Sequence, residues 1–310
     1  MTQNLYLYLY SGSNFIQRVK CLSLSLDREV YTPYESATAE FFYAGNFCDN
    51  IDRIGIFLDN TRIFLGLADT VRQYRRQNAS FVRIQSRSFT SLLTQNELEP
   101  GLHSNLTMAS LMTDFYQFPS YITYENPAGS GYIFVKSGNT MWDGVVSFGY
   151  KLTGHYPYIL HNHICLSAPQ AGTPAEFQQN QILEYGTVTD TTKLISHYHM
   201  EDISGTPDAY QQENPSASAF NIVRHKQISF DSSFLHDPDD ALTFRNLYSR
   251  RGCESSYLVY DGFQNEMPGQ NITFGTHIQN ETVCRVRSSF GANGFRTRLD
   301  CYHDGFYNLN

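Results

Sequence analysis

The chain has 310 residues, a net charge of −8 and a charged fraction of only 17%, while aromatic residues reach 15%. Such a length can form two or three domains with separate cores, and 41% hydrophobic residues is typical of a soluble globular protein. The acidic balance and the lack of a long basic run argue against a surface that binds nucleic acid by neutralising phosphates. The weakly charged, aromatic composition favours a surface used for assembly.

The start of the sequence, MTQNLYLYLYSG, lacks the basic and unbroken apolar regions of a secretion signal. No apolar run reaches the roughly 18 residues that a membrane-spanning helix needs, so we expect no membrane segment. The six cysteines are scattered and form no CxxC motif, which favours reduced, buried thiols over a disulfide framework. These features predict a protein made in the cytoplasm.

The first 95 residues alternate like antiparallel strands. In LYLYLY, Leu5, Leu7 and Leu9 share one face and the tyrosines the other. A similar alternation continues in CLSLSL, and tight turns are indicated at Asp59-Asn60 and near Asn78. We therefore predict a first β-barrel over residues 1–95.

Residues 96–172 change to a helical period. SNLTMASLMTDFYQF is apolar at every third or fourth residue, which predicts a helix capped by Ser104 or Asn105. NTMWDGVVSFGYKL predicts a second helix, with Thr140 as its N-cap and Asp143 in its first turn. Short strands lie between and after these helices, so the segment is predicted to be a small α+β domain.

Residues 173–310 return to strand patterns and are predicted to form a second β-barrel with inserted loops. The last hairpin is indicated by GANG at residues 291–294. The acidic stretch HDPDDAL, from His236 to Leu242, lacks the spaced ligands of a calcium loop and favours a solvated helix start. The fold class is thus mainly β (α+β), with two antiparallel barrels and an α+β domain between them.

The two barrels are predicted to be related by duplication. Residues 66–89 and 275–306 each contain a Gly-led strand followed by an Arg-bearing hairpin, ending in Phe89 or Phe306. We expect five strands of the two regions to follow the same order and direction. The same alignment places Val71 and Val283 both at the start of the first hairpin strand.

Two HxH patterns raise the question of a metal site. His161, His163 and Cys165 would share one face of a strand, and His197 and His199 have the same spacing. A third ligand has no marked candidate in the sequence beyond His155 or the other pair. Packing faces of two ordinary strands are therefore the favoured interpretation, and we expect the three residues of the first pattern to bind no metal.

The order of these patterns resembles a known family. FLG at residues 64–66, the RS step at Arg87-Ser88 and the leucine pair Leu92-Leu93 match the first barrel of the baseplate hub proteins of contractile phage tails and related injection machines, including the late-control D proteins. Trp142-Asp143 matches the opening of their second helix, and residues 196–200 match an S-x-Y-x strand of their second barrel. The resemblance spans most of the chain.

The resemblance implies a structural protein that is not an enzyme and has no cofactor, catalytic residue or metal ligand. It implies a homotrimer that adapts a sixfold tail tube to a threefold central spike in the tail baseplate of a virion or injection particle. Its partners would be the tail tube protein and the central spike protein, with a tape measure protein as a further candidate. DNA would pass through the channel without specific binding.

Two other functions are compatible with the sequence. The HxH strands could belong to a metal-dependent enzyme of a β-rich fold, which would need a carboxylate within reach of the histidines. The aromatic excess could belong to a glycan-binding β module, whose mark would be an exposed Trp. Trp142 is the one Trp of the chain, and the pattern places it on the core face of a helix.

Overall fold

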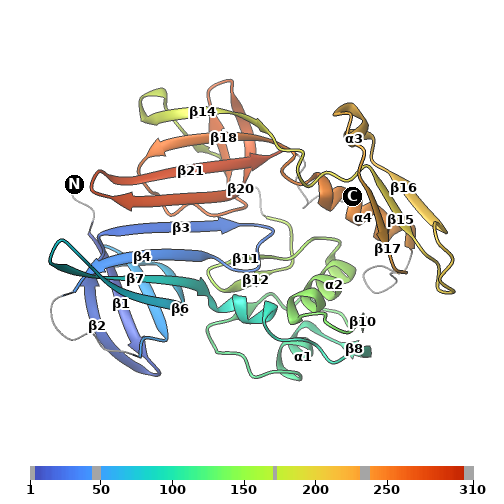
Figure 1. The fold of residues 1–310 in the computed structure, drawn as a ribbon, viewed down its shortest axis with the longest axis horizontal. Helices are drawn as coiled ribbons and strands as arrows, with labels where there is room; N and C mark the ends of the chain where they lie inside the picture. Colours follow the sequence, from blue (N-terminus) through green and yellow to red (C-terminus); the bar gives the residue numbers. More distant parts are fainter. Residues whose placement is uncertain (1–3, 44–49, 170–172, 231–237, 304–310) are drawn as a thin grey trace.

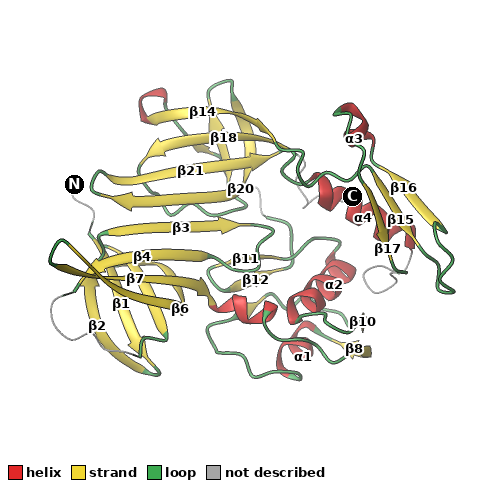
Figure 2. Cartoon of the chain, viewed as in Figure 1, coloured by secondary structure: helices red, strands yellow, loops and turns green. Residues whose placement is uncertain are grey.

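The computed structural model describes residues 4–43, 50–169, 173–230 and 238–303. It is mainly β, as the sequence predicts (Figure 2). The N-terminal strands are β1 (Leu5–Ser11), β2 (Asn14–Lys20), β3 (Ser23–Glu29), β4 (Ser36–Phe42), β5 (Arg53–Leu58), β6 (Thr61–Arg76) and β7 (Ala79–Ser88). A 3-10 helix, η1 (Phe89–Thr94), follows them.

The local patterns of this region are confirmed. Leu5, Leu7 and Leu9 of β1 are buried, and β1 forms a hairpin with β2. Asp59 turns the chain between β5 and β6 with a positive φ of 53°, and Gln77 and Asn78 do the same between β6 and β7. Asp and Asn tolerate this conformation better than most residues, which is why the turn positions were predictable.

The middle region holds two helices and short strands. Its elements are β8 (Gly101–Leu106), α1 (Met108–Thr113), β9 (Thr123–Tyr124), β10 (Gly131–Val135), α2 (Met141–Thr153), β11 (Tyr158–Leu160) and β12 (His163–Cys165). Thr140 caps α2, and Asp143 completes the capping box, as predicted. The predicted cap of α1 is wrong: Ser104 and Asn105 belong to β8, which pairs with β10, and Thr107 is the N-cap.

The C-terminal region combines strands of the main sheet with an insertion. The sheet strands are β13 (Ala175–Glu176), β14 (Ile182–Thr189), β18 (Glu254–Asp261), β19 (Asn271–Phe274), β20 (Ile278–Gly291) and β21 (Gly294–Tyr302), and η2 (Gln179–Gln181) precedes β14. The insertion between β14 and β18 contains β15 (His197–Met200), β16 (Tyr210–Glu213), α3 (Pro215–Ala219), β17 (His225–Ile228) and α4 (Pro238–Arg250). The acidic residues Asp239 and Asp240 lie in the first turn of α4, as expected for a helix start; residues 236 and 237 lie outside the described residues.

The two ends of the chain repeat one arrangement of five strands. Strands β3 to β7 lie in the order β5-β6-β7-β4-β3, and β14 with β18 to β21 lie in the order β19-β20-β21-β18-β14. Every neighbouring pair in both sets is antiparallel. We call these sets the N-terminal and C-terminal repeats. The predicted correspondence of five strands is confirmed.

The register of the repeats also agrees. In the N-terminal repeat a bulge lies between the pairs Ala68↔Ser86 and Thr70↔Gln85, and in the C-terminal repeat one lies between Val283↔Cys301 and Arg285↔Asp300. Counted from the hairpin turn, these pairs are equivalent. The expected match of Val71 with Val283 is therefore wrong: Val71 is equivalent to Val286, and both lie inside their strands. A hairpin turn fixes register, whereas the leading glycines used for the alignment do not.

One strand pair joins the repeats. β3 pairs with β20 over Leu24↔Phe290 to Glu29↔Arg285, so a single sheet runs from β14 to β2 (Figure 1). The N-terminal repeat encloses one cluster of buried apolar residues and the C-terminal repeat another. The middle region has its own core around α1 and α2 and lies beside the end of the sheet where β11 and β12 are drawn.

Candidate functional site

The first HxH pattern is split between a turn and a strand. β11 and β12 form an antiparallel hairpin, and His161 and Asn162 are its two turn residues, with positive φ values of 51° and 67°. His163 and Cys165 lie on β12. The expectation that all three residues share a strand face is therefore wrong for His161, because two consecutive residues with positive φ close a two-residue hairpin.

The hairpin turn fastens the middle region to the N-terminal repeat. The Asn162 side chain accepts a hydrogen bond from the Phe89 N–H and donates one to the Leu65 carbonyl. The backbone N–H of His161 donates to Glu35 Oε1 at 3.1 Å, and His161 Nδ1 lies 3.5 Å from the same oxygen. Asn162 is 4% exposed, so these contacts are part of the interior.

Glu35 also faces Arg28, and both are almost fully buried. Arg28 Nε lies 3.4 Å from Glu35 Oε1, and the guanidinium donates to the carbonyls of Ile63 and Glu266. Burial raises the pKa of Glu35, but Arg28 and His161 outweigh it and hold the pKa below its ordinary value. The ion pair thus ties together both repeats and the hairpin turn, which is a structural role.

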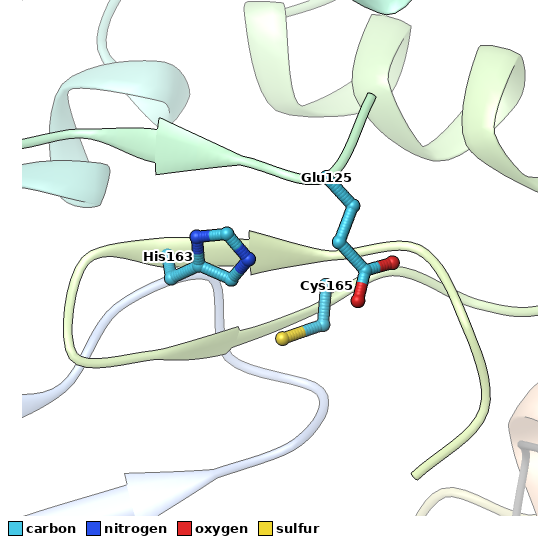
Figure 3. A group of neighbouring side chains, drawn as sticks. All are labelled: Glu125, His163 and Cys165. Carbon is cyan, nitrogen blue, oxygen red and sulfur yellow. The ribbon is translucent and has the colours of Figure 1, made fainter. Parts of the chain in front are cut away.

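A carboxylate does lie within reach of the other two residues. Figure 3 shows Glu125, which follows β9, beside His163 and Cys165 of β12. One ligand atom from each residue lies within 4.8 Å of the others. The parallel pairing of β12 with β9 brings them together. Glu125 could not be predicted from the sequence, because its proximity to His163 depends on two strands far apart in the chain.

Each of these three groups already has a protein partner. Glu125 Oε2 accepts hydrogen bonds of 2.8 Å from the Leu166 N–H, the Ser167 N–H and the Ser167 hydroxyl. His163 Nδ1 lies 2.8 Å from Thr123 Oγ1, and the Tyr158 hydroxyl bonds the Cys165 thiol. The donor set suits Zn²⁺, but its oxygen and sulfur atoms are engaged in holding β12 in place.

The charges of this cluster are consistent with a packing role. Partial burial raises the pKa of Glu125, but its backbone donors outweigh burial and keep the pKa below its usual value. Burial, with a smaller effect of the Glu125 charge, raises the pKa of Cys165 to about 11. A thiol with a raised pKa stays protonated and is a poor nucleophile at neutral pH. The cluster therefore lacks the activated group that thiol catalysis needs.

The second HxH pattern lies elsewhere. His197 and His199 are on β15, which pairs with β16 and β17, whereas β12 pairs with β9 and β11. The two HxH strands therefore do not meet around one ion. β17 instead brings His225 beside the second pair, with His225 directly opposite His197. His225 could not be predicted as a neighbour of this pair from the sequence, because only the parallel pairing of β15 and β17 places it there.

Trp142 lies in the interior between the middle region and the insertion. It is 6% exposed and lines a cavity of about 340 Å³ between α2 and α4, together with Tyr156, Phe244 and Tyr248. A sugar-stacking platform needs an exposed aromatic face. Trp142 is too buried to offer such a face, so the exposed Trp expected of a glycan-binding module is not found.

Five of the six cysteines, all but Cys48, lie among the described residues, where they are buried and form no disulfide. The predicted burial is confirmed for these five. In the described part of the chain, no helix has both the length and the apolar character required to cross a membrane.

Comparisons by sequence find no relative: no protein-family model matches the chain, and no curated protein matches it. Comparisons by structure do. A tail protein from Neisseria meningitidis MC58 superposes with a TM-score of 0.71 at 13% identity, covering 98% of both chains. The 43 kDa tail protein of prophage MuSo2 from Shewanella oneidensis has a TM-score of 0.73 at 11% identity, covering 99% of this chain and 100% of that one.

A third similar structure comes from a secretion system. The Escherichia coli c3393 protein, described as a type VI secretion component similar to T4 bacteriophage tail proteins gp27 and gp5, has a TM-score of 0.60 at 8% identity. The match covers 98% of this chain and 79% of that one. At these identities the likeness concerns the fold, so this chain shares, over nearly its full length, the fold of phage tail proteins.

Proposed function

We propose that the protein is a structural baseplate hub of a phage tail or of a related injection particle, without enzymatic activity. In this role three copies form a ring that joins a sixfold tail tube to a threefold central spike. Two findings support the proposal: the fold shared with phage tail proteins, and the repeat that this fold contains. Three copies of a chain with two equivalent repeats supply six equivalent surfaces.

The pairing of β3 with β20 is the observation that carries the proposal. It covers the outer edge of the N-terminal repeat with the hairpin strand of the C-terminal repeat. The strand equivalent to β3 is β14, and the strand equivalent to β20 is β6. Among the described residues β14 pairs only with β18, and β6 beyond Ala68 pairs only with β7, so each has an edge without a strand partner. An unpaired edge strand is a template for pairing with another chain.

The internal pairing predicts how two copies would join. By equivalence, β14 takes the place of β3, and β6 of the partner subunit takes the place of β20. The pairs Arg287↔Asp27 and Ser288↔Leu26 then become Arg72 opposite Val188 and Gln73 opposite Thr187. Continued to the hairpin turn, the same register puts Arg76 opposite Glu184, which are oppositely charged. Leu183, Tyr185 and Val188 of β14 are exposed apolar residues that such a neighbour would cover.

The ring accounts for the other proposed partners. The tail tube protein would dock on the six repeats, and the spike would contact the three middle regions. The net charge of −8 per chain gives the assembled ring an acidic balance, so DNA could pass without being retained. The tape measure protein remains a further proposed partner. The proposed site of action is the tail baseplate of a virion or injection particle, after assembly in the bacterial cytoplasm.

Cysteine pairs across the proposed contact test both the ring and its register. We would make Arg72→Cys with Val188→Cys, and separately Gln73→Cys with Thr187→Cys. Consecutive opposite pairs alternate between hydrogen-bonded and non-hydrogen-bonded positions, and the side chains are closer in the non-hydrogen-bonded pair, which we therefore expect to form the disulfide. Thr70→Cys with Leu183→Cys is the control, because these positions lie at opposite ends of the proposed pairing. Mass photometry gives the oligomeric state.

We expect a trimer of 35.5 kDa chains, and covalent dimers and trimers on non-reducing gels for one in-register pair but not for the control. A protein that stays monomeric at micromolar concentration would overturn the hub proposal. A trimer in which neither in-register pair cross-links would keep the trimer and overturn the β14–β6 contact.

A further inference from the structure

Three histidines gather on one face of the sheet formed by β15, β16 and β17. The rings of His197 and His225 stack in parallel, with centroids 4.3 Å apart and planes at 5°. His199 lies two residues further along β15, and its Nε2 is 2.9 Å from Nδ1 of His225. We call these residues the histidine cluster. Two ring nitrogens from neighbouring strands thus lie within hydrogen-bond distance of each other.

Carboxylates surround the cluster. His199 Nδ1 lies 3.0 Å from Asp208 Oδ1, and His197 Nε2 lies 3.7 Å from Glu213 Oε1. A histidine that binds a metal through one nitrogen usually directs the other at a carboxylate, which fixes the ring and makes it more basic. Asp208 lies at ion-pair distance from His199 Nδ1, the ring nitrogen that does not contact His225, although no hydrogen bond joins the two groups.

Neighbouring cations are turned away. Lys226 follows His225 on β17 and points to the opposite face, where it lines the cavity beside α4. The Arg224 guanidinium donates to the carbonyls of Thr191, Thr192 and Leu194. The face that carries the histidine cluster therefore combines imidazole nitrogens with two carboxylates, a combination suited to a cation.

We propose that His199 Nε2 and His225 Nδ1 bind one late first-row divalent metal ion, such as Ni²⁺ or Cu²⁺, with the Asp208 carboxylate beside His199 Nδ1. Imidazole nitrogens bind these ions at about 2.0–2.1 Å. Two such bonds at a right angle, the angle of square-planar or octahedral sites, place the nitrogens roughly 2.9 Å apart. His225 binds as the neutral tautomer with its proton on Nε2, so no proton is lost overall.

His197 is a positioning residue in this site. Its Nδ1 is 2.8 Å from Ser196 Oγ, which is itself held by the backbone of Arg224 on the β17 side. The parallel ring of His197 then limits the tilt of His225. The ion would clamp β15 to β17 and stiffen the insertion, a role independent of the proposed ring.

Metal binding is testable on the full-length protein. Metal-free protein would be dialysed against Ni²⁺ or Cu²⁺, and the bound ion measured by mass spectrometry against the wild type for His225→Ala, His199→Ala and Asp208→Asn. We expect one ion per chain, loss of at least 100-fold in affinity for either histidine variant, and a loss of about 10–100-fold for Asp208→Asn. With Cu²⁺, electron paramagnetic resonance should show coupling to imidazole nitrogen.

His163→Ala is the matched control, because it removes a histidine from the cluster with Glu125 and Cys165 and leaves the histidine cluster intact. Circular dichroism would confirm that each variant is folded. Unchanged binding in folded His225→Ala protein, or binding that disappears in His163→Ala, would overturn the proposal. Absence of binding in the wild type would do the same and would leave the hub proposal unaffected.

Discussion

The N-terminal and C-terminal repeats share strand order, direction and register, yet their outer strands differ in burial. In β3, Leu24 and Leu26 are 3% and 1% exposed, because β20 and the core cover them. In β14 the equivalent residues are Tyr185, which is 40% exposed, and Thr187, which is exposed as well. The outer strand of the N-terminal repeat thus pairs with another strand of the same chain, whereas the outer edge of β14 has no strand partner among the described residues. In the proposed ring a neighbouring copy would remove this contrast, because it would cover β14 as β20 covers β3.

The connection after each outer strand also differs. In the N-terminal repeat a short connection leads from β3 to β4 and carries Glu35, buried against Arg28. In the C-terminal repeat the equivalent connection from β14 to β18 holds the whole insertion with β15, β16, β17, α3 and α4. The connection in the N-terminal repeat thus carries a buried ion pair, whereas that in the C-terminal repeat carries a small apolar core of its own and the histidine cluster.

The largest expected effect is on stability at Glu35. Glu35→Ala leaves Arg28 charged and buried without its partner, so we expect a loss of about 3–5 kcal/mol in the free energy of unfolding. The equivalent residue of the C-terminal repeat is Glu254, which is exposed. Glu254→Ala should change stability by less than about 0.5 kcal/mol. Urea unfolding of both variants measures the difference, and equal losses would show that the two positions are not distinguished by burial.

An intermediate effect is expected at Gly66, where β6 passes close to β7. A Cβ at this position would lie 2.2 Å from the Arg87 carbonyl oxygen, so the backbone must shift. We expect Gly66→Ala to cost about 1–3 kcal/mol, the usual range for overpacking. The control is Gly291→Ala, since a Cβ there meets nothing within 4 Å. Thermal melts that rank the two variants in the reverse order would contradict this reading of the β6–β7 contact.

The smallest effect on stability is expected at the open edge. Val188→Lys should change the unfolding free energy of the isolated chain by less than about 0.5 kcal/mol, because Val188 is exposed and has no strand on its outer side among the described residues. It should nevertheless shift the protein from trimer to monomer, since a lysine on an edge strand opposes pairing. Ile203→Lys, at an apolar residue that is 86% exposed within the insertion, is the control and should leave the trimer intact. Mass photometry across a dilution series separates the two.

Features of the fold set by nearby residues could be predicted from the sequence. The alternation of LYLYLY, the turns at Asp59 and Asn78, and the Thr140–Asp143 capping box all depend on residues within a few positions of one another. The α1 cap was predicted wrongly. Ser104 and Asn105 have good capping side chains, but they lie in strand β8, which pairs with β10. Here a tertiary contact outweighed a local preference.

The candidate sites depended on long-range pairing and were largely beyond the sequence. Glu125 reaches His163 only through the parallel contact of β9 with β12, and His225 reaches His199 only through that of β15 with β17. No periodic pattern specifies which strands become neighbours. His161 was placed on the strand because alternation alone does not distinguish the last strand residue from a turn, and the Asn beside it was the one local sign.

The pairing of β3 with β20 also has a consequence during synthesis. β3 leaves the ribosome early, whereas β20 is among the last strands made, so the outer edge of β3 stays unpaired until translation is nearly complete. Nascent chains on one messenger would then hold open edges side by side, and the β20 of a finished copy fits the β3 of an unfinished one. Correct folding therefore requires the β20–β21 hairpin to pair with β3 of its own chain before the hairpin of a neighbouring chain pairs there. Fast formation of this last contact favours the correct product.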